Sequence, residues 1–193
     1  MNAALVLFSE KDFHEVTVEE IAERVGLSKG TMYLYFENKE NLFLSIIQEK
    51  TDALLARIKR AIDGPDPYLK RLERLIGSWL GFFEEHQPYF KVIHSEKTRL
   101  DFTNKDSLHR HMLKSSIDFA KILNAFIEEG ITLGLIRSLK PGVLVKSLQG
   151  LINSFIFECI FMRTKCSLVG ETKQILDVFL NGALKKPQDE EVS

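Results

Sequence analysis

One segment of this 193-residue chain, residues 17–36, constrains its fold more than any other. Thr17 and Glu20 have the spacing of a capping box, in which two side chains satisfy free amide groups at the start of a helix. Apolar residues follow at helical spacing. Gly26 then stands where a glycine commonly ends a helix. The segment therefore predicts a short helix that closes on a glycine turn.

A second short helix is predicted directly after this turn, because the hydroxyl of Ser28 can cap it. Met32 and Phe36 are four residues apart and are expected on its core face. The outer face then holds polar side chains and a glycine: Lys29, Gly30, Thr31, Tyr33 and Tyr35. Lysine neutralises phosphate, hydroxyl groups hydrogen-bond to it, and glycine lets a backbone approach closely. Two helices joined in this way are typical of proteins that place the second helix in the major groove of DNA.

The next helix is predicted over residues 39–62. It opens near Asn38 and Lys39, where unpaired amide groups and the lysine would suit one more phosphate. A cluster of Pro, Gly and Asp over residues 63–67 ends it and gives the clearest boundary in the chain.

These residues at this spacing resemble the DNA-binding domain of the TetR family of bacterial transcriptional regulators. The resemblance is carried by Ala4, Leu7, Phe8, Phe13, Thr17, Ile21, Ala22, Gly26, Ser28, Gly30, Tyr33, Phe36, Lys39 and Leu42. It implies an all-helical homodimer that represses transcription from an operator and is released by a small molecule. It also implies base contacts by Lys29, Gly30 and Thr31, and phosphate contacts by Thr17, Ser28, Tyr33, Tyr35 and Lys39.

The charge of the DNA-binding segment is unusual for this function. Residues 1–50 hold five Lys or Arg against nine Asp or Glu, a net charge of −4, whereas the remainder carries +3. A negative field disfavours long-range attraction to DNA. We therefore expect modest non-specific affinity, with binding that relies on hydroxyl groups and amide dipoles.

The rest of the chain is predicted to be helical, with helices over residues 68–86, 108–131, 141–163 and 171–184. The predicted fold class is all-α. An N-terminal three-helix DNA-binding domain with a helix-turn-helix, residues 1–47, precedes a larger helical regulatory and dimerisation bundle, residues 48–184. Residues 185–193 are charged and are predicted to form a disordered tail.

Aromatic residues of this bundle could line a cavity for a small apolar or aromatic effector: Trp79, Phe82, Phe83, Phe119, Phe126 and Phe155. The same side chains could instead fill a solid core. Glu158 is the only charged residue between Lys146 and Arg163, and it could receive a cationic ligand or pair with a base at an interface.

The helices over residues 141–163 and 171–184 are predicted to form the dimer interface. The first is apolar on nearly every side, and only one stripe of it can face its own domain. Two such helices from each subunit would form a four-helix bundle.

No enzyme motif is present in the sequence: it contains no glycine-rich phosphate loop, nucleophile elbow or His-Glu-x-x-His, and no metal-ligand spacing. We expect no cofactor. The absence of a signal peptide and of an apparent membrane-spanning run predicts a cytoplasmic protein. Two functions remain open. One is a repressor released by a small molecule, and the alternative is a DNA-binding dimer without such an effector, controlled by a partner protein.

Overall fold

The structure is a computed structural model that describes residues 2–94, 105–162 and 167–182. The tail predicted over residues 185–193 lies outside these residues. Over the described ranges the chain is helical and contains no strand, which confirms the predicted fold class. The elements are α1 (Asn2–Glu10), α2 (Val18–Arg24), α3 (Lys29–Tyr35), α4 (Lys39–Ile62), α5 (Tyr68–Glu85), α6 (Gln87–His94), α7 (Lys105–Thr132), α8 (Pro141–Phe161), the 3-10 turn η2 (Val169–Glu171) and α9 (Thr172–Asn181).

The caps predicted for the two short helices are present. The Thr17 hydroxyl oxygen accepts a hydrogen bond from the Glu20 amide at 3.1 Å, and the Ser28 oxygen accepts one from the Thr31 amide at 3.1 Å. Gly26 lies between them with φ of +70°, a left-handed conformation that favours glycine. The sequence therefore determines this turn locally.

An aromatic cluster holds α1 and the turn after it against the start of α4. The rings of Phe8, Phe13 and Phe43 lie 5.0 to 5.5 Å apart between centroids, in stacked and edge-on pairs. All three side chains are buried, with Ile21 and Met32 in the same core. The three short helices and the first turns of α4 thus form one packed unit, which we call the head.

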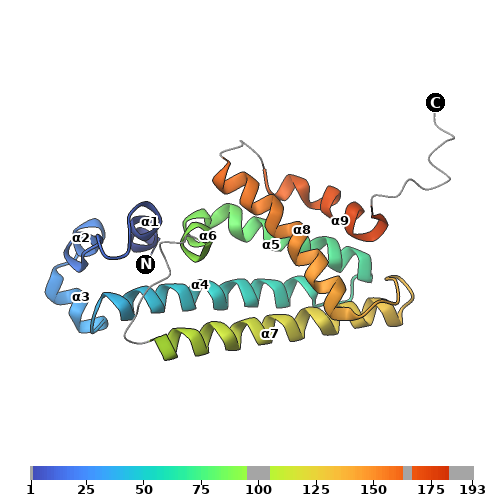
Figure 1. Cartoon of the computed structure of the whole chain (residues 1–193), viewed down its shortest axis with the longest axis horizontal. Coiled ribbons are helices and arrows are strands. Elements are labelled where there is room, and N and C mark those ends of the chain that lie inside the picture. Colours follow the sequence, from blue (N-terminus) through green and yellow to red (C-terminus); the bar gives the residue numbers. More distant parts are fainter. Residues whose placement is uncertain (1, 95–104, 163–166, 183–193) are drawn as a thin grey trace.

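Helix α4 leaves the head and continues along the whole bundle, so that it belongs to both parts of the molecule (Figure 1). The predicted boundary at residue 47 falls inside this helix. In the bundle α4 packs against α5 and α7, and α8 crosses the bundle in contact with α5, α7 and α9. A change in the tilt of α4 would therefore move the head relative to the bundle.

The largest differences between predicted and observed helix boundaries are three residues, at two places on the C-terminal side of the chain. The helix predicted to reach residue 184 ends at Asn181, because Gly182 takes φ of +70°. The helix predicted over residues 108–131 begins three residues earlier, at Lys105. Neither difference changes which residues share a helix face.

Helix α8 is long and apolar enough to cross a membrane, judged by length and composition alone. The expectation that the chain holds no such run was therefore wrong. Core helices of water-soluble proteins meet the same criterion, and α8 buries one face of its length through Leu144, Val145, Leu148, Ile152, Ile156 and Ile160. Packing inside the bundle thus accounts for much of its apolar character.

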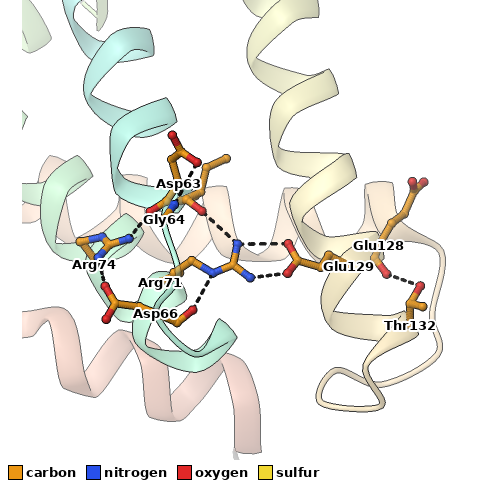
Figure 2. Close-up of polar contacts among 9 residues, drawn as sticks. Asp63, Gly64, Asp66, Arg71, Arg74, Glu128, Glu129 and Thr132 are labelled. Atoms are coloured by element: carbon orange, nitrogen blue, oxygen red, sulfur yellow. Dashed lines mark hydrogen bonds and ion pairs between the residues drawn. The ribbon is translucent and has the colours of Figure 1, made fainter.

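Two arginines of α5 fasten the C-terminal end of α4, where helix carbonyls have no amide partners. Arg71 donates to the carbonyl of Ile62 at 3.0 Å and to that of Asp66 at 3.1 Å, and its guanidinium also pairs with the Glu129 carboxylate of α7. Arg74 donates to the carbonyls of residues 61 and 63 and to the Asp66 carboxylate. Figure 2 shows how these bonds join α4, α5 and α7 at one end of the bundle.

Replacing Arg71 tests how much these bonds at the end of α4 stabilise the fold. Arg71→Met should lower the free energy of unfolding by about 2–3 kcal/mol, because two carbonyl groups lose a charged donor. The matched control is Glu129→Gln, which removes only the charge of a partly exposed partner and should cost less than about 1 kcal/mol. Urea unfolding measures both variants. An equal loss in the two would show that the carbonyl bonds contribute little.

Candidate DNA-binding surface and effector pocket

The short helix α3 turns one face to the core and leaves the other free. Met32 is buried and Phe36 is half-buried, as predicted, whereas Tyr33 and Tyr35 are 45% and 75% exposed. A side chain added at Gly30 would meet only the Ser28 hydroxyl, at 3.8 Å, so the backbone there is open to a partner. This outer face is the candidate DNA-binding surface.

Lys29 is the only charged residue on α3, and its ammonium group is engaged with α2. It forms an ion pair with the Glu19 carboxylate and lies 5.9 Å from the centre of the Tyr33 ring. The hydrogen bond between the two raises the pKa of Lys29 and lowers the pKa of Glu19. Both side chains stay about half exposed, so a DNA phosphate or base could take the place of Glu19.

The structure gives Lys39 a different position from the one predicted for it. Its ammonium group donates to the carbonyls of Phe13 at 2.7 Å and Val16 at 2.8 Å, and lies 4.4 Å from the centre of the Phe13 ring. Partial burial lowers its pKa. Lys39 therefore ties the start of α4 to the turn between α1 and α2. A phosphate contact by this group would cost those bonds.

The remaining predicted DNA contacts lie at the same end of the molecule, around α2 and α3. Thr17 and Ser28 are exposed, and each accepts an amide hydrogen bond through its hydroxyl oxygen. Thr31 is half-buried, with its hydroxyl 2.8 Å from that of Ser28. An amide hydrogen bond accepted by a hydroxyl oxygen leaves the hydroxyl hydrogen available, whereas in the Ser28–Thr31 pair one of the two hydrogens is used between them and one remains for a phosphate oxygen.

A pocket of about 290 Å³ opens in the bundle between α4, α5, α6, α7 and α8. Most of its wall is apolar, and five of its lining side chains are polar. The lining residues are Thr51, Leu54, Leu55, Trp79, Phe83, Tyr89, Ile93, His94, Ser115, Phe119 and Asn153. The site can hold an apolar group and also offers hydrogen-bonding side chains.

Three of the predicted wall residues line this pocket and three do not. Trp79, Phe83 and Phe119 are in the wall, where the Trp79 and Phe119 rings meet edge to face at 4.7 Å. Phe82 is fully buried in the core, and Phe155 is half-buried on α8 outside the pocket.

The other two predicted residues also lie away from the pocket. Phe126 stacks on the buried Tyr68 ring at 4.7 Å and borders a separate, shallower hollow between α4 and α7. Glu158 is exposed on α8 and does not line the pocket. Helical spacing places residues on one face, but it does not tell which face of a bundle helix meets a cavity.

The polar residues of the pocket were missed from sequence. The Thr51 hydroxyl donates to the carbonyl of Ile47, so the Tyr89 hydroxyl must donate to Thr51, at 2.8 Å. Burial raises the pKa of Tyr89, which keeps it a neutral phenol. Nδ1 of His94 lies 3.1 Å from the carbonyl of Phe90 and therefore carries a hydrogen. The sequence pattern did not indicate these side chains, because contacts such as that between Thr51 and Tyr89 join residues 38 positions apart.

Helix α6 connects this pocket to the head. It contributes Tyr89, Ile93 and His94 to the pocket wall and also packs against α1 (Figure 1). The head therefore touches two helices that line the pocket, α4 and α6. A ligand that displaced either one would act on the head directly.

Comparisons with known proteins agree with the DNA-binding reading. The family model for bacterial regulatory proteins of the tetR family matches residues 1–46. Over 187 residues the chain is 24% identical to the fatty acid metabolism regulator protein of Bacillus subtilis, covering 96% of this chain and 94% of that protein. Over 134 residues it is 27% identical to the transcriptional repressor KstR2 of Mycobacterium tuberculosis, covering 67% and 66% of the two chains.

The fold is also similar to that of a solved structure with a bound ligand. The transcriptional regulator FadR of Bacillus subtilis, in complex with stearoyl-CoA, superposes with a TM-score of 0.78 at 22% sequence identity. The match covers 95% of this chain and 97% of the other. At this identity the likeness establishes the fold.

Two lysine variants test whether Lys39 stabilises the head and whether Lys29 contacts DNA. Lys39→Met should lower the free energy of unfolding by about 1–3 kcal/mol, because buried carbonyl groups lose their donor. Lys29→Met removes an exposed ion pair and should leave the free energy of unfolding almost unchanged, yet weaken operator binding about 5- to 150-fold. Thermal unfolding and a DNA-binding titration measure the two effects. A Lys39 variant of unchanged stability would contradict the assignment.

Proposed function

The chain belongs to the TetR family of bacterial transcriptional regulators, and we propose that it is a repressor that leaves its operator when a small apolar molecule fills the bundle pocket. DNA binding through a helix-turn-helix is the shared property of this family, and its members are regulators, not enzymes. The observation that carries the release step is the pocket itself, which lies between the two helices that contact the head. Its presence favours a small-molecule effector over control by a partner protein.

We assign operator contacts to the exposed face around α3. Lys29, Gly30 and Thr31 face the bases, and the hydroxyl groups of four residues face the phosphates: Thr17, Ser28, Tyr33 and Tyr35. The support is their common position at one end of the molecule, where all but the half-buried Thr31 are exposed, and the fixed geometry of the caps. Lys39 is left out of this set because its ammonium group is used inside the head.

The proposed effector carries an acyl chain. The apolar wall formed by Leu54, Leu55, Trp79 and Phe119 suits a chain of methylene groups, whose burial is favourable by about 0.8 kcal/mol for each group. One similar structure holds stearoyl-CoA, and one relative is a fatty acid metabolism regulator. The polar groups near Thr51 and Tyr89 would receive the head of such a molecule.

Release requires the ligand to prefer the form of the dimer that binds DNA poorly. Filling the pocket separates α4, which bears Thr51 and Leu55, from α6, which bears Tyr89 and Ile93. Because both helices pack against the head, their separation tilts it. In a two-fold dimer this tilt changes the spacing of the two α3 helices, which an operator fixes at about 34–36 Å.

The dimer interface is assigned to α8 and α9, in a cytoplasmic protein. Large apolar side chains remain exposed along these helices and at the end of α8: Val143, Phe157, Phe161, Met162 and Val178. Such a stripe on a water-soluble protein marks a contact surface. In this proposal residues 1–47 bind DNA and residues 48–184 bind the effector and form the dimer, although α4 belongs to both parts.

The effector proposal is tested with stearoyl-CoA as the probe and free CoA as its control. Trp79 is the only tryptophan and lies in the pocket wall, so its fluorescence should change on binding. The same addition should weaken operator binding about 5- to 150-fold, the usual range for an allosteric effector. Leu55→Phe should weaken ligand binding by about 1–2 kcal/mol, because it overfills the pocket.

The matched control is Leu69→Phe, which places the same bulk on an exposed position of α5 and should bind the probe as the unmodified protein does. Binding without any change in operator affinity would show that stearoyl-CoA is a ligand but not the effector. No fluorescence response to acyl compounds of any chain length would exclude an acyl effector.

Phe157→Glu tests the dimer interface. The side chain is 45% exposed in one subunit, so the variant should keep its helicity, whereas a charge buried between two subunits would be costly. Light scattering should show a dimer for the unmodified protein and a monomer for the variant. Ile117→Glu makes the same kind of change on the exposed side of α7 and should remain dimeric. A dimeric Phe157 variant would place the interface elsewhere.

A further inference from the structure

Leu34 on α3 is the large apolar side chain with the greatest exposure among the described residues, at 82%. Single exposed leucines are common on protein surfaces. This one lies on the seven-residue helix that forms the centre of the helix-turn-helix, where each outward side chain is available to DNA. The DNA contacts that the family resemblance implies involve its neighbours on α3 and do not include Leu34.

Leu34 occupies the middle of the outward face. Successive residues of a helix are about 100° apart, so Leu34 is about 200° from Met32, the buried residue of α3. Gly30 is four residues earlier, which places it beside Leu34 on the same face. The point of α3 farthest from the core therefore consists of one bare stretch of backbone and one leucine side chain.

The charged and polar groups flank this point. Lys29 is drawn toward α2 by its ion pair with Glu19 and lies over the ring of Tyr33. The Thr31 hydroxyl is turned to that of Ser28, at 2.8 Å. The centre of the face is thus apolar and uncharged, while hydrogen-bonding groups stand at its edges.

We propose that Leu34 reads a thymine in each operator half-site by packing against its C5-methyl group. This inference rests on the proposed operator contacts of α3. Among the groups that base pairs present in the major groove, the thymine methyl is the apolar one. A leucine at the centre of the inserted face can meet it, and Gly30 next to it lets the helix approach without a side chain in between. The contact makes Leu34 a specificity-determining residue.

The test begins with an operator selected from random DNA by the unmodified protein. Thymines of one half-site are then replaced singly by deoxyuridine, which removes the methyl group and keeps the hydrogen-bonding edge. The unmodified protein should lose roughly three- to fivefold in affinity at one of these positions, as expected for one buried methyl group. Leu34→Ala should bind the normal operator more weakly and be insensitive to deoxyuridine at that same position.

Two further variants make the result specific. Leu34→Met keeps an apolar side chain and should retain the sensitivity to the methyl group. Leu133→Ala removes the same atoms from another exposed leucine, after the end of α7, and should behave as the unmodified protein does. Circular dichroism should show all the variants folded, because both leucines are more than half exposed.

Two results would overturn the proposal. One is a Leu34→Ala protein of unchanged operator affinity. The other is that each deoxyuridine substitution lowers the operator affinity of the unmodified protein and of Leu34→Ala by the same factor. If the unmodified protein selects no operator, the operator contacts of α3 are wrong as a whole, and that outcome is distinct from a selected operator without methyl dependence.

Discussion

Helix α4 is the element on which the rest of this structure depends, because it is shared by the head and the bundle and is fixed at both ends by cations bound to backbone carbonyls. Lys39 ties its first residue to the turn after α1, and Arg71 and Arg74 hold its last turn against α5. At 1.5 Å per residue its 24 residues span about 36 Å. A rod of this length turns a small displacement beside the pocket into a larger one at the head.

The position of the pocket fits the function proposed for helix α4. The wall residues of α4 lie near its middle, between the two clamped ends, and those of α6 lie on a helix that packs against α1. A ligand between α4 and α6 therefore acts on both connections to the head at once. Since packed helices shift between discrete arrangements more readily than they deform, such a displacement favours a second orientation of the head over a gradual one.

The sequence predicted those features that local chemistry determines. The Thr17 and Ser28 caps, the left-handed Gly26 and the full extent of α4 follow from residues a few positions apart, and the structure confirms them. The bonds of Lys39 cross more than twenty positions of sequence, and the Tyr89 hydroxyl meets Thr51 across 38. Contacts of this kind depend on how helices pack, which periodicity does not determine. For the same reason only three of the six aromatic residues predicted for the pocket line it, and the parts played by α4 and α6 were not predicted.

The contacts of its lysines determine how the negatively charged head can interact with DNA. Lys29 is paired with Glu19 and Lys11 with Glu20 at 2.5 Å, while Lys39 is bound to carbonyls, so three of the four Lys and Arg side chains of residues 1–47 are already engaged within the protein. DNA must therefore compete with carboxylates of the protein for its few cations. When a lysine exchanges a carboxylate for a DNA phosphate, one ion pair replaces another. The gain in binding free energy is smaller than for a lysine without a partner, which limits the affinity that phosphate contacts can supply. Among the proposed operator contacts, those without a strong partner in the free protein are the exposed tyrosine hydroxyls of α3 and its apolar centre. The proposed operator contacts therefore assign specificity to shape and base edges more than to general attraction to DNA.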